Sequence, residues 1–319
     1  MLSKKVILWT SVGVSVAVGI SLAATALLRR RKRGKIKRVI DTVKELTKAC
    51  VRMRDPDHVE ELVCRLIKGG AKKLQVITDF DNTITRSHFN GKKCSSTHRV
   101  IEDASVVPKE FRLRAKKIQE QFYPIEIDPN MSMEEKIPHM VEWYNQSHNI
   151  LISSGINKAD IPKMIEESML MLRDGGEAFF EMLHDHNVPT LVFSAGLGDV
   201  LEEALRRHHC MYSNLKFLSN YMEFDDQGNI VGFKGEVIHM FNKTSNEKHF
   251  DRTNVLLLGD SLGDLAMLSG HEHDTVLTIG FLNSKIEERL PQYMNSFDIV
   301  LIDDQTLDVV NGILRKILY

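Results

Sequence analysis

Two aspartates stand one residue apart directly after an apolar run, in the stretch KLQVITDFDNTIT at 73–85. The carboxylate of Asp79 can attack phosphorus and form an aspartyl phosphate. Asp81 can protonate the leaving oxygen and later accept a proton from water. Two carboxylates tolerate this proximity when a divalent cation lies between them, and oxygen ligands beside a phosphate favour Mg²⁺. The pair therefore predicts Mg²⁺-dependent phosphoryl transfer.

Four further polar residues follow apolar runs later in the chain, in an order that suits the same chemistry. Ser194 could hold phosphoryl oxygens, and Lys243 could balance the charge that builds in the transition state. Asp260 could complete the metal site, and Asp264, one helical turn later, could support it through water. Each has an ordinary explanation when taken alone, as a helix cap, a solvated lysine or a charge at a helix N-terminus. Their joint occurrence at strand ends favours a catalytic site.

The second half of the chain alternates strand and helix patterns, which is typical of an α/β protein with a doubly wound parallel sheet. In such sheets ligands bind at the carboxyl ends of the strands, where the predicted catalytic residues stand. The alternation at 220–238, with a turn at 226–229, predicts a hairpin. Apolar runs predict strands at 188–194, 254–259, 275–280 and 298–302, and helical patterns predict helices at 197–208, 261–269, 284–290 and 305–318.

A helical insert interrupts this core after its first strand. Its apolar residues recur at helical spacing, so we expect a bundle of amphipathic helices. The chain before the strand is also helical in pattern, and Gly69-Gly70 would end its last helix. The predicted helices are 41–54, 58–70, 109–122, 132–148, 158–172 and 175–186.

The amino-terminal segment at 6–28 carries no charge, and its 23 residues would span about 34 Å as a helix, enough for a bilayer core. Eight basic residues at 29–38 follow, and such a block keeps the rest of the chain in the cytosol. A signal peptide with a cleavage-like Ala24-Thr25-Ala26 is the alternative. We expect an uncleaved transmembrane helix beside anionic lipid.

The chain is predicted to contain a membrane anchor and a core domain interrupted by a cap. The membrane anchor with its basic flank covers 1–38, and the start of a Rossmann-like core covers 39–85. A helical-bundle cap covers 86–187, to which helices in 39–70 could contribute, and the rest of the core covers 188–319.

Composition limits the partners. The formal net charge is −1, so the whole chain gives no argument for nucleic acid as a partner. The four cysteines lie far apart, which favours reduced thiols in a cytosol-facing protein. The histidines of HEHD at 271–274 lack further ligands at a recognised spacing, so surface histidines are their more common explanation.

Several stretches resemble one family of phosphohydrolases. The four motifs of the haloacid dehalogenase (HAD) superfamily occur in order in KLQVITDFDNTIT, FSAGLGDVLEE, GFKGEVIHMFNK and LLLGDSLGDLAM. Together with FYPIEIDPNMSMEEKIPHMVEWY, they make residues 57–319 resemble the cytosolic 5′-nucleotidase III family, also called pyrimidine 5′-nucleotidase. The resemblance implies Mg²⁺-dependent hydrolysis of nucleoside 5′-monophosphates, with CMP and UMP, or 7-methyl-GMP in one branch, as substrates. It also implies that some members pass the phosphoryl group to another nucleoside.

The same resemblance assigns roles to individual residues. It places the base-recognition glutamate on Glu126 and a further substrate contact on Ser147. Trp143 or Phe89 could stack on a base, although helix packing explains Trp143 equally well. The nucleophile falls on Asp79, the general acid and base on Asp81, the phosphate contacts on Ser194, Ala195 and Lys243, and the metal ligands on Asp79, Asp81 through its backbone carbonyl, and Asp260, with Asp264 in support.

Two features depart from the family pattern. Asn82 stands where the family often has a bulkier apolar residue, and this change could alter the packing behind the nucleophile. Only 16 residues separate Lys243 from Asp260, which shortens the surface helix or loop between them.

Two other functions remain open at this point. One is another small-molecule phosphatase of the same chemistry, similar to phosphoserine phosphatase, because the catalytic motifs do not fix the leaving group. The other is a non-catalytic membrane-anchored scaffold, although a scaffold has no reason to keep all the charged positions together. Longer family members with an amino-terminal membrane segment imply the endoplasmic reticulum, with the mitochondrial outer membrane as the alternative. We expect a monomer.

Overall fold

The computed structural model describes most of the chain, namely residues 38–128, 130–244 and 250–319. The chain divides into two compact units after Thr42. The described part of the first unit contains a 3-10 helix, η1 (Ile40–Thr42). All the elements described below belong to the second unit.

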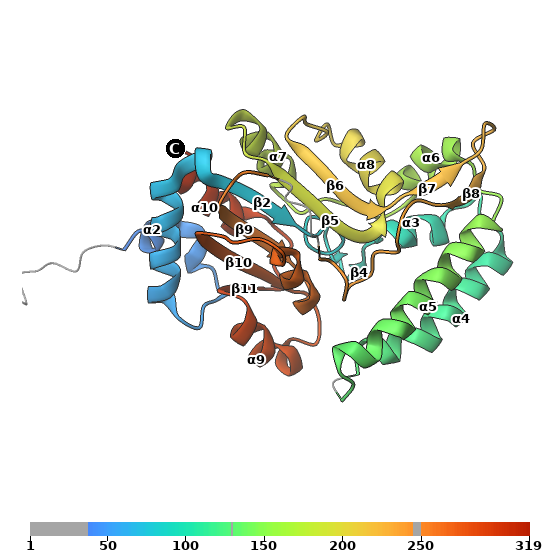
Figure 1. Cartoon of the computed structure of the whole chain (residues 1–319), viewed down its shortest axis with the longest axis horizontal. Coiled ribbons are helices and arrows are strands. Elements are labelled where there is room, and N and C mark those ends of the chain that lie inside the picture. Colours follow the sequence, from blue (N-terminus) through green and yellow to red (C-terminus); the bar gives the residue numbers. More distant parts are fainter. Residues whose placement is uncertain (1–37, 129, 245–249) are drawn as a thin grey trace, which may run out of the picture. The chain divides into compact units, whose positions relative to one another are not determined.

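Seven strands of the second unit form one sheet, and most of its strands run in parallel. These strands are β1 (Val51–Arg52), β2 (Leu74–Thr78), β5 (Thr190–Leu197), β6 (Leu215–Asn220), β9 (Asn254–Gly259), β10 (Thr275–Leu282) and β11 (Ile299–Ile302). Their order is β1-β11-β10-β9-β2-β5-β6 (Figure 1), and the pairing of β1 with β11 is antiparallel. Every residue of β2 and β9 is buried, as expected for parallel strands covered on both faces. The predicted α/β fold with a parallel sheet is confirmed.

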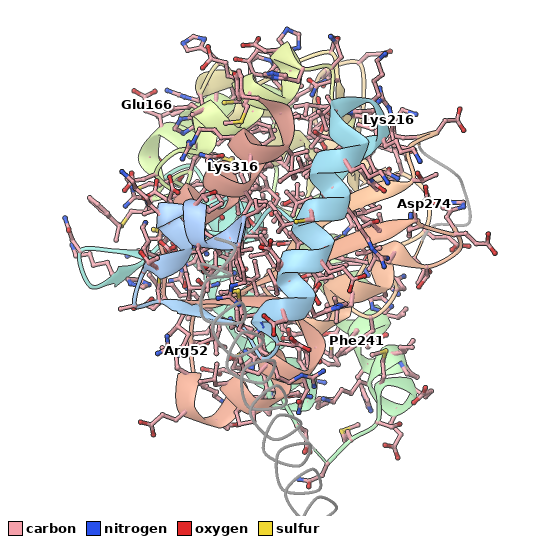
Figure 2. The ribbon with its side chains drawn as sticks, turned by 90° about the vertical axis from the view of Figure 1, so that its left-hand side faces the viewer. Arg52, Glu166, Lys216, Phe241, Asp274 and Lys316 are labelled. Atoms are coloured by element: carbon pink, nitrogen blue, oxygen red, sulfur yellow. The ribbon has the colours of Figure 1, made fainter. Side chains whose placement is uncertain are left out.

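Helices cover this sheet. The helix α2 (Pro56–Lys73) lies across its strands and contacts β2, β9 and β10 (Figure 2). The Asp55 carboxylate caps this helix by accepting hydrogen bonds from two backbone N–H groups of the first turn. Gly70 has a left-handed φ of 58°, at the position where the sequence predicts a helix end. The remaining core helices are α7 (Gly176–Asp185), α8 (Gly198–Arg207), the 3-10 helix η4 (Leu262–Leu268), α9 (Ile286–Ser296) and α10 (Asp308–Leu318).

A helical insert connects β2 to β5. Its longest helices, α4 (Lys109–Glu126) and α5 (Met133–Ile152), lie side by side (Figure 1). Ser132 and Glu135 start α5 with a capping box, in which each side chain accepts from the backbone N–H of the other. The insert also contains β3 (His88–Phe89), β4 (Lys92–Lys93), α3 (Thr97–Asp103), the 3-10 helix η3 (Lys158–Asp160) and α6 (Ile161–Glu167).

The chain returns from the insert along an extended path that the sequence analysis assigned to a helix. The predicted helix at 158–172 ends at Glu167. Residues 168–174, called the return segment below, instead pair with the chain that leaves β2. Leu172 forms an antiparallel bridge with Thr85. This tertiary pairing outweighs the helical pattern of the segment. The boundaries of the cap at 86–187 remain a prediction.

Two other predicted elements have different outcomes. The predicted helix at 41–54 is wrong, since this range contains the end of η1 and the short 3-10 helix η2 (Lys44–Thr47), and it then enters the strand β1. Pairing of β1 with β11 overrides the local helical preference. The predicted hairpin at 220–238 is confirmed, and it consists of β7 (Met222–Phe224) and β8 (Ile230–Phe233).

The predicted transmembrane helix has no support in the structure. Within the described ranges, no helix combines the length and the apolar composition needed to cross a membrane. The segment 6–28, on which the prediction rests, lies outside the described residues.

Candidate active site

A buried lysine joins two acidic side chains at the carboxyl edge of the sheet. Asp79 directly follows β2, and its backbone N–H donates to the carbonyl of Leu258 in β9. Lys243 comes from the loop after β8, and its Nζ lies 2.5 Å from Oδ1 of Asp79. The same Nζ lies 2.7 Å from Oδ1 of Asp264. The three side chains are almost fully buried, so this arrangement places one cation between two carboxylates inside the protein.

Three carboxylates gather at this point. Asp79, Asp260 and Asp264 each offer an oxygen within 4.8 Å of the others. Burial raises the pKa of Asp79 to about 7, against the lowering effect of Lys243. Burial and the charges of Asp79 and Asp264 also raise the pKa of Asp260. Burial alone would lower the pKa of Lys243, but Asp264 and Asp79 raise it above its ordinary value. The cluster therefore holds excess negative charge that one lysine does not offset.

These carboxylates fit a hard divalent cation. Oδ2 of Asp79 is buried and has no hydrogen-bond partner among the described residues, so it is available as a ligand. Mg²⁺ prefers carboxylate and carbonyl oxygens and is usually bound through one or two carboxylates. Asp79 and Asp260 would provide such oxygens.

Asp264 has a different position from the other two acids. Its Oδ2 accepts from the backbone N–H of Asp260 at 3.1 Å and of Ser261 at 2.9 Å, while its Oδ1 accepts from Lys243. Both oxygens are thus already engaged, as expected for a residue that orients a ligand. On the other side, the hydroxyl of the buried Tyr293 donates to the carbonyl of Asp260 at 2.5 Å. Asp260 is fixed from both sides by these bonds.

The carboxylate of Asp81 is not one of the three clustered carboxylates, and it is held by Thr97. The backbone N–H of Thr97 donates to Oδ1 at 3.0 Å, and its hydroxyl donates to Oδ2 at 2.7 Å. Burial raises the pKa of Asp81 to about 6, although both bonds from Thr97 lower it. A carboxyl group with such a pKa can exist in both protonation states near neutral pH, which suits proton transfer. The sequence analysis missed Thr97, which starts α3 after the capping residue Ser96.

Ser194 and Ala195 lie in the second half of β5, just before Gly196, which approaches Asp81. Oγ of Ser194 accepts from the backbone N–H of Gly196 at 3.0 Å. A Cβ at Gly196 would lie 2.1 Å from Oγ1 of Thr97 and 2.8 Å from Oδ2 of Asp81, so only glycine allows this close approach. The carbonyl of Ala195 accepts from the amide of Asn220 at 2.9 Å. The structure therefore brings Ser194 and Ala195, two of the three predicted phosphate contacts, to the edge that carries the aspartates.

Glu126 ends α4 and is half-buried. Burial raises its pKa to about 7, and Arg289, Lys136 and Lys93 lower it in part. The pKa of the Tyr144 phenol, on α5, is raised by burial and then by the charges of Glu126, Asp81 and Asp79. The Tyr144 phenol therefore lies close enough to Glu126 in the insert, and to Asp79 and Asp81 after β2, for their charges to affect it. Ser147, one turn after Tyr144, is also half-buried.

Aromatic side chains surround Tyr144. Its ring centroid lies 5.9 Å from that of His98 and 6.4 Å from that of His239, so it joins the insert to the loop before Lys243. Trp143 instead stacks on Phe122 of α4, with centroids 6.1 Å apart. This contact agrees with the packing interpretation of Trp143, which the sequence left open.

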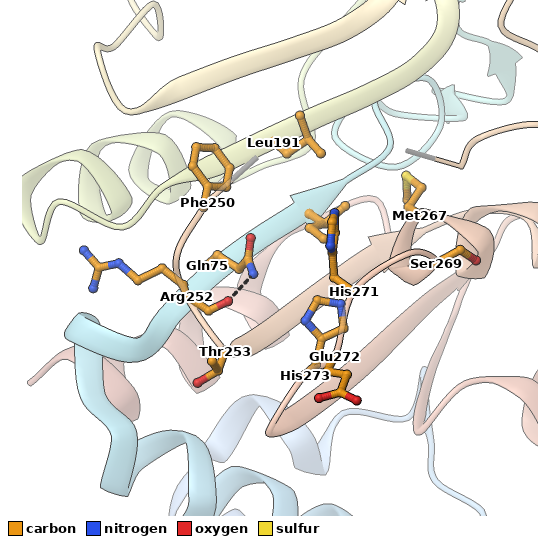
Figure 3. A pocket seen from close by; sticks show the side chains of 11 residues that line it. Gln75, Leu191, Phe250, Arg252, Thr253, Met267, Ser269, His271, Glu272 and His273 are labelled. Atoms are coloured by element: carbon orange, nitrogen blue, oxygen red, sulfur yellow. Dashed lines mark hydrogen bonds between the residues drawn. The ribbon is translucent and has the colours of Figure 1, made fainter. Parts of the chain in front are cut away.

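A separate cavity of about 50 Å³ lies near the start of β2 and β9 (Figure 3). The amide of Gln75 donates to the carbonyl of Arg252 at 2.5 Å beside it. His271 and His273 also line it. Since none of its lining residues is a predicted site residue, the cavity is distinct from the acidic cluster.

Comparisons with known proteins find relatives over most of this chain. A sequence model of the pyrimidine 5′-nucleotidase (UMPH-1) family matches residues 82–318. A human 7-methylguanosine phosphate-specific 5′-nucleotidase is 46% identical over 287 residues, which cover 87% of this chain and 96% of the relative. The crystal structure of cytosolic 5′-nucleotidase IIIB bound to cytidine has 34% sequence identity and a TM-score of 0.81. That match covers 86% of this chain and 96% of the other.

The comparisons also correct the predicted localisation. A Caenorhabditis elegans relative is 37% identical, over 81% of this chain and 73% of its own length, and its name includes the words cytosolic 5′-nucleotidase 3. The described part of the chain contains no helix that could cross a membrane. The name of this relative contradicts the prediction of a membrane-anchored protein at the endoplasmic reticulum or the mitochondrial outer membrane, and that prediction is corrected accordingly.

The family match covers most of the chain, including the insert helices, the end of β5, Lys243 and the end of β9. The resemblance drawn from the sequence motifs is confirmed over this range. The protein is a 5′-nucleotidase with a HAD-like fold, and this chain belongs to the pyrimidine 5′-nucleotidase (UMPH-1) family.

Proposed function

We propose that this enzyme hydrolyses the 5′-phosphate of CMP, UMP and 7-methyl-GMP through an aspartyl phosphate on Asp79. The observation that carries the proposal is the pair of Asp79 oxygens: Oδ1 is bound by Lys243, while Oδ2 is buried without a partner among the described residues. One oxygen is thus held in place and the other is available for chemistry. The cytidine in the related crystal structure and the name of the human relative support these substrates.

In the first step, a carboxylate oxygen of Asp79 attacks phosphorus, and the bond between phosphorus and the O5′ of the nucleoside breaks. Protonated Asp81 donates its proton to O5′, so the nucleoside leaves as an alcohol. Thr97 holds the Asp81 carboxyl group in place for this transfer. Ser194 and Lys243 bind phosphoryl oxygens and oppose their growing negative charge.

In the second step, water attacks the phosphorus of the aspartyl phosphate. Asp81, now ionised, accepts a proton from this water, and the bond between phosphorus and the Asp79 oxygen breaks. Inorganic phosphate leaves and Asp79 is restored. Bound Mg²⁺, held by Asp79, Asp260 and the backbone carbonyl of Asp81, would supply positive charge opposite the phosphate oxygens.

We propose that Glu126 and Ser147 select the base. An ionised Glu126 accepts hydrogen bonds from ring N–H or exocyclic amine groups, which 7-methylguanine and cytosine offer. The half-buried position of Glu126 strengthens such a bond relative to water. The neighbouring rings of Tyr144 and His98 provide apolar surface for the base. The enzyme is proposed to act as a monomer.

Phosphate release from CMP, UMP, 7-methyl-GMP, AMP and phosphoserine tests this function. We expect the highest kcat/KM among CMP, UMP and 7-methyl-GMP, with Mg²⁺ required. Preferred hydrolysis of phosphoserine would refute the nucleotidase assignment. Trapping of a phosphorylated Asp79 peptide by mass spectrometry would test the covalent step separately.

A further inference from the structure

Arg173 is a buried cation outside the set of catalytic residues. It lies in the return segment and is only 1% exposed, the largest of the fully buried side chains described. Its backbone N–H donates to the carbonyl of Ile84, so the residue is fixed beside the chain that leaves β2. Burying a charged group is costly unless hydrogen bonds compensate, and an arginine in this place calls for a role.

All the hydrogen bonds of its guanidinium go to neutral oxygens. Nε donates to the carbonyl of Thr83 at 2.7 Å, and Nη2 donates to the carbonyl of Asn82. Nη2 also donates to the amide oxygen of Asn283 at 2.9 Å, and Nη1 donates to the carbonyl of Asp304. A planar guanidinium can span several acceptors in fixed directions, whereas an ammonium group cannot. Arg173 thus connects the loops after β2, β10 and β11.

The first two of these carbonyls immediately follow the catalytic pair. Asn82 has a left-handed φ of 61°, a conformation that asparagine adopts more readily than most residues. Its carbonyl receives a second bond, at 3.0 Å, from the amide of Asn283. The turn closes when the backbone N–H groups of Thr83, Ile84 and Thr85 donate to the carbonyl of Phe80. Arg173 therefore holds the outer side of the turn that contains Asp81.

Arg173 does not compete for the catalytic carboxylates. Its bonds leave the side chains of Asp79 and Asp81 to Lys243 and Thr97. The ring of Phe281 covers the guanidinium, whose central carbon lies 4.4 Å from the ring centroid, and this contact suits a desolvated cation. Burial lowers the pKa of Arg173 to about 10, and the charge of Asp260 opposes this effect, so the side chain stays charged at neutral pH.

We propose that Arg173 is a positioning residue for phosphoryl transfer: it fixes the peptide groups of Asn82 and Thr83 and thereby the placement of the Asp81 backbone carbonyl and carboxylate. This inference rests on the proposed function, because it assumes that Asp79 and Asp81 bind Mg²⁺ and the phosphate. Arg173 itself makes no hydrogen bond to the side chain of Asp79 or of Asp81. Its loss should thus affect kcat and Mg²⁺ affinity more than KM.

The test compares Arg173→Met, which removes the charge and all donors, with Arg173→Lys, which keeps the charge and one nitrogen. We expect kcat for CMP to fall about 100-fold in Arg173→Met and about 10-fold in Arg173→Lys, with KM within about 3-fold of wild type. Calorimetric titration of the substrate-free protein with MgCl₂ should show about 10-fold weaker binding in Arg173→Met. A merely structural role would not shift Mg²⁺ affinity in a folded variant.

Asn311→Ala is the matched control. The Asn311 amide is buried and donates to the carbonyl of Gly175 at 2.9 Å, close to Arg173 but away from the turn at 82–83. This variant should lose stability while kcat and Mg²⁺ affinity stay within about 2-fold of wild type.

Folded Arg173→Met with wild-type kcat and Mg²⁺ affinity would overturn the proposal. If Arg173→Met does not fold, the test uses Arg173→Lys. Wild-type kcat and wild-type Mg²⁺ affinity in Arg173→Lys would also overturn the proposal. Wild-type protein that releases no phosphate from any nucleotide would instead refute the proposed function.

Discussion

Nζ of Lys243 lies 2.5 Å from Oδ1 of Asp79, although the two residues are 164 positions apart in the chain. The bond joins the end of β2 to a loop that follows the hairpin of β7 and β8. Because Lys243 also binds Asp264, removing any one of these groups changes the charge balance of the other two. The consequences for turnover and stability can be separated experimentally.

Asp79→Asn should abolish turnover without unfolding the protein. Asparagine has nearly the same shape but cannot attack phosphorus as a carboxylate, so we expect kcat for CMP to fall by at least about 1,000-fold. Lys243 keeps Asp264 as a partner, and one of the repelling carboxylates is gone, so the melting temperature should not fall. Phosphate release and thermal melting check both points. Asp55→Asn, at the cap of α2, is the control because asparagine also caps helices. Wild-type turnover in Asp79→Asn would exclude the covalent mechanism.

Lys243→Met should destabilise the protein in a pH-dependent way. It leaves Asp79 and Asp264 buried without their cation, which costs about 3–5 kcal/mol when both are ionised. The pKa of Asp79 in the folded protein is already about 7 and should rise further in this variant. Above pH 7 the buried Asp79 carboxylate then ionises less readily than in wild type, and the variant loses more stability than wild type does. We therefore expect the largest loss in free energy of unfolding at pH 8 and a smaller loss at pH 5, measured by urea denaturation in a chelator. Lys48→Met removes a partly exposed pair with Asp308 and should cost about 1 kcal/mol or less at both pH values. Equal losses at pH 5 and pH 8 in Lys243→Met would contradict this account.

Mg²⁺ should stabilise the folded protein through the acidic cluster. At 100 times the dissociation constant, a ligand specific for the folded state adds about 2.7 kcal/mol, which raises the melting temperature. Asp260→Asn should remove this shift and abolish activity, because one carboxylate ligand is lost. Asp274→Asn, an exposed aspartate labelled in Figure 2, should keep the shift. A shift that survives in Asp260→Asn would place the metal elsewhere, and full activity in excess chelator would rule out metal dependence.

Glu126→Gln should remove a pH dependence of substrate affinity. The pKa of Glu126 is raised to about 7 by burial, so the wild-type carboxylate becomes ionised as pH rises through 7. If it accepts hydrogen bonds from the base, KM for 7-methyl-GMP should fall about 10-fold between pH 6 and pH 8 in wild type, apart from the titration of the phosphate itself. Glu126→Gln measures the part of the KM change that comes from the titration of the phosphate. Glu142→Gln, on the exposed side of α5, should show the same KM profile as wild type. The same KM profile in wild type and Glu126→Gln would exclude this role.

The parallel sheet could be predicted because its strands are short apolar runs, buried on both faces and separated by helical patterns. The placement of Asp79, Ser194 and Asp260 at one edge followed from the same rule, since parallel strands end on the same side, whereas Lys243 reaches this edge from the loop after β8. These inferences need only local patterns and the topology that the patterns imply. The roles given to Glu126 and Ser147 rested on resemblance and remain predictions.

The features that the sequence did not reveal depend on contacts between distant segments. Thr97 binds Asp81 from a short helix, and its only local signal is the preceding cap at Ser96. Arg173 lies directly after the predicted helix at 158–172, in a segment that is extended because it pairs with the chain leaving β2. Similarly, no local signal marks the bond from Tyr293 to Asp260. Such partners are visible only when the fold is known.

The bridge between Thr85 and Leu172 holds the chain that enters the insert next to the chain that leaves it. The entropy of closing a loop grows only slowly with its length, so the core tolerates inserts of many sizes at this point. The helices of the insert, including α4 with Glu126, are therefore joined to the core through two adjacent segments. Under the proposed roles, substitutions in these helices change which nucleoside is selected and leave the residues at the strand ends in place.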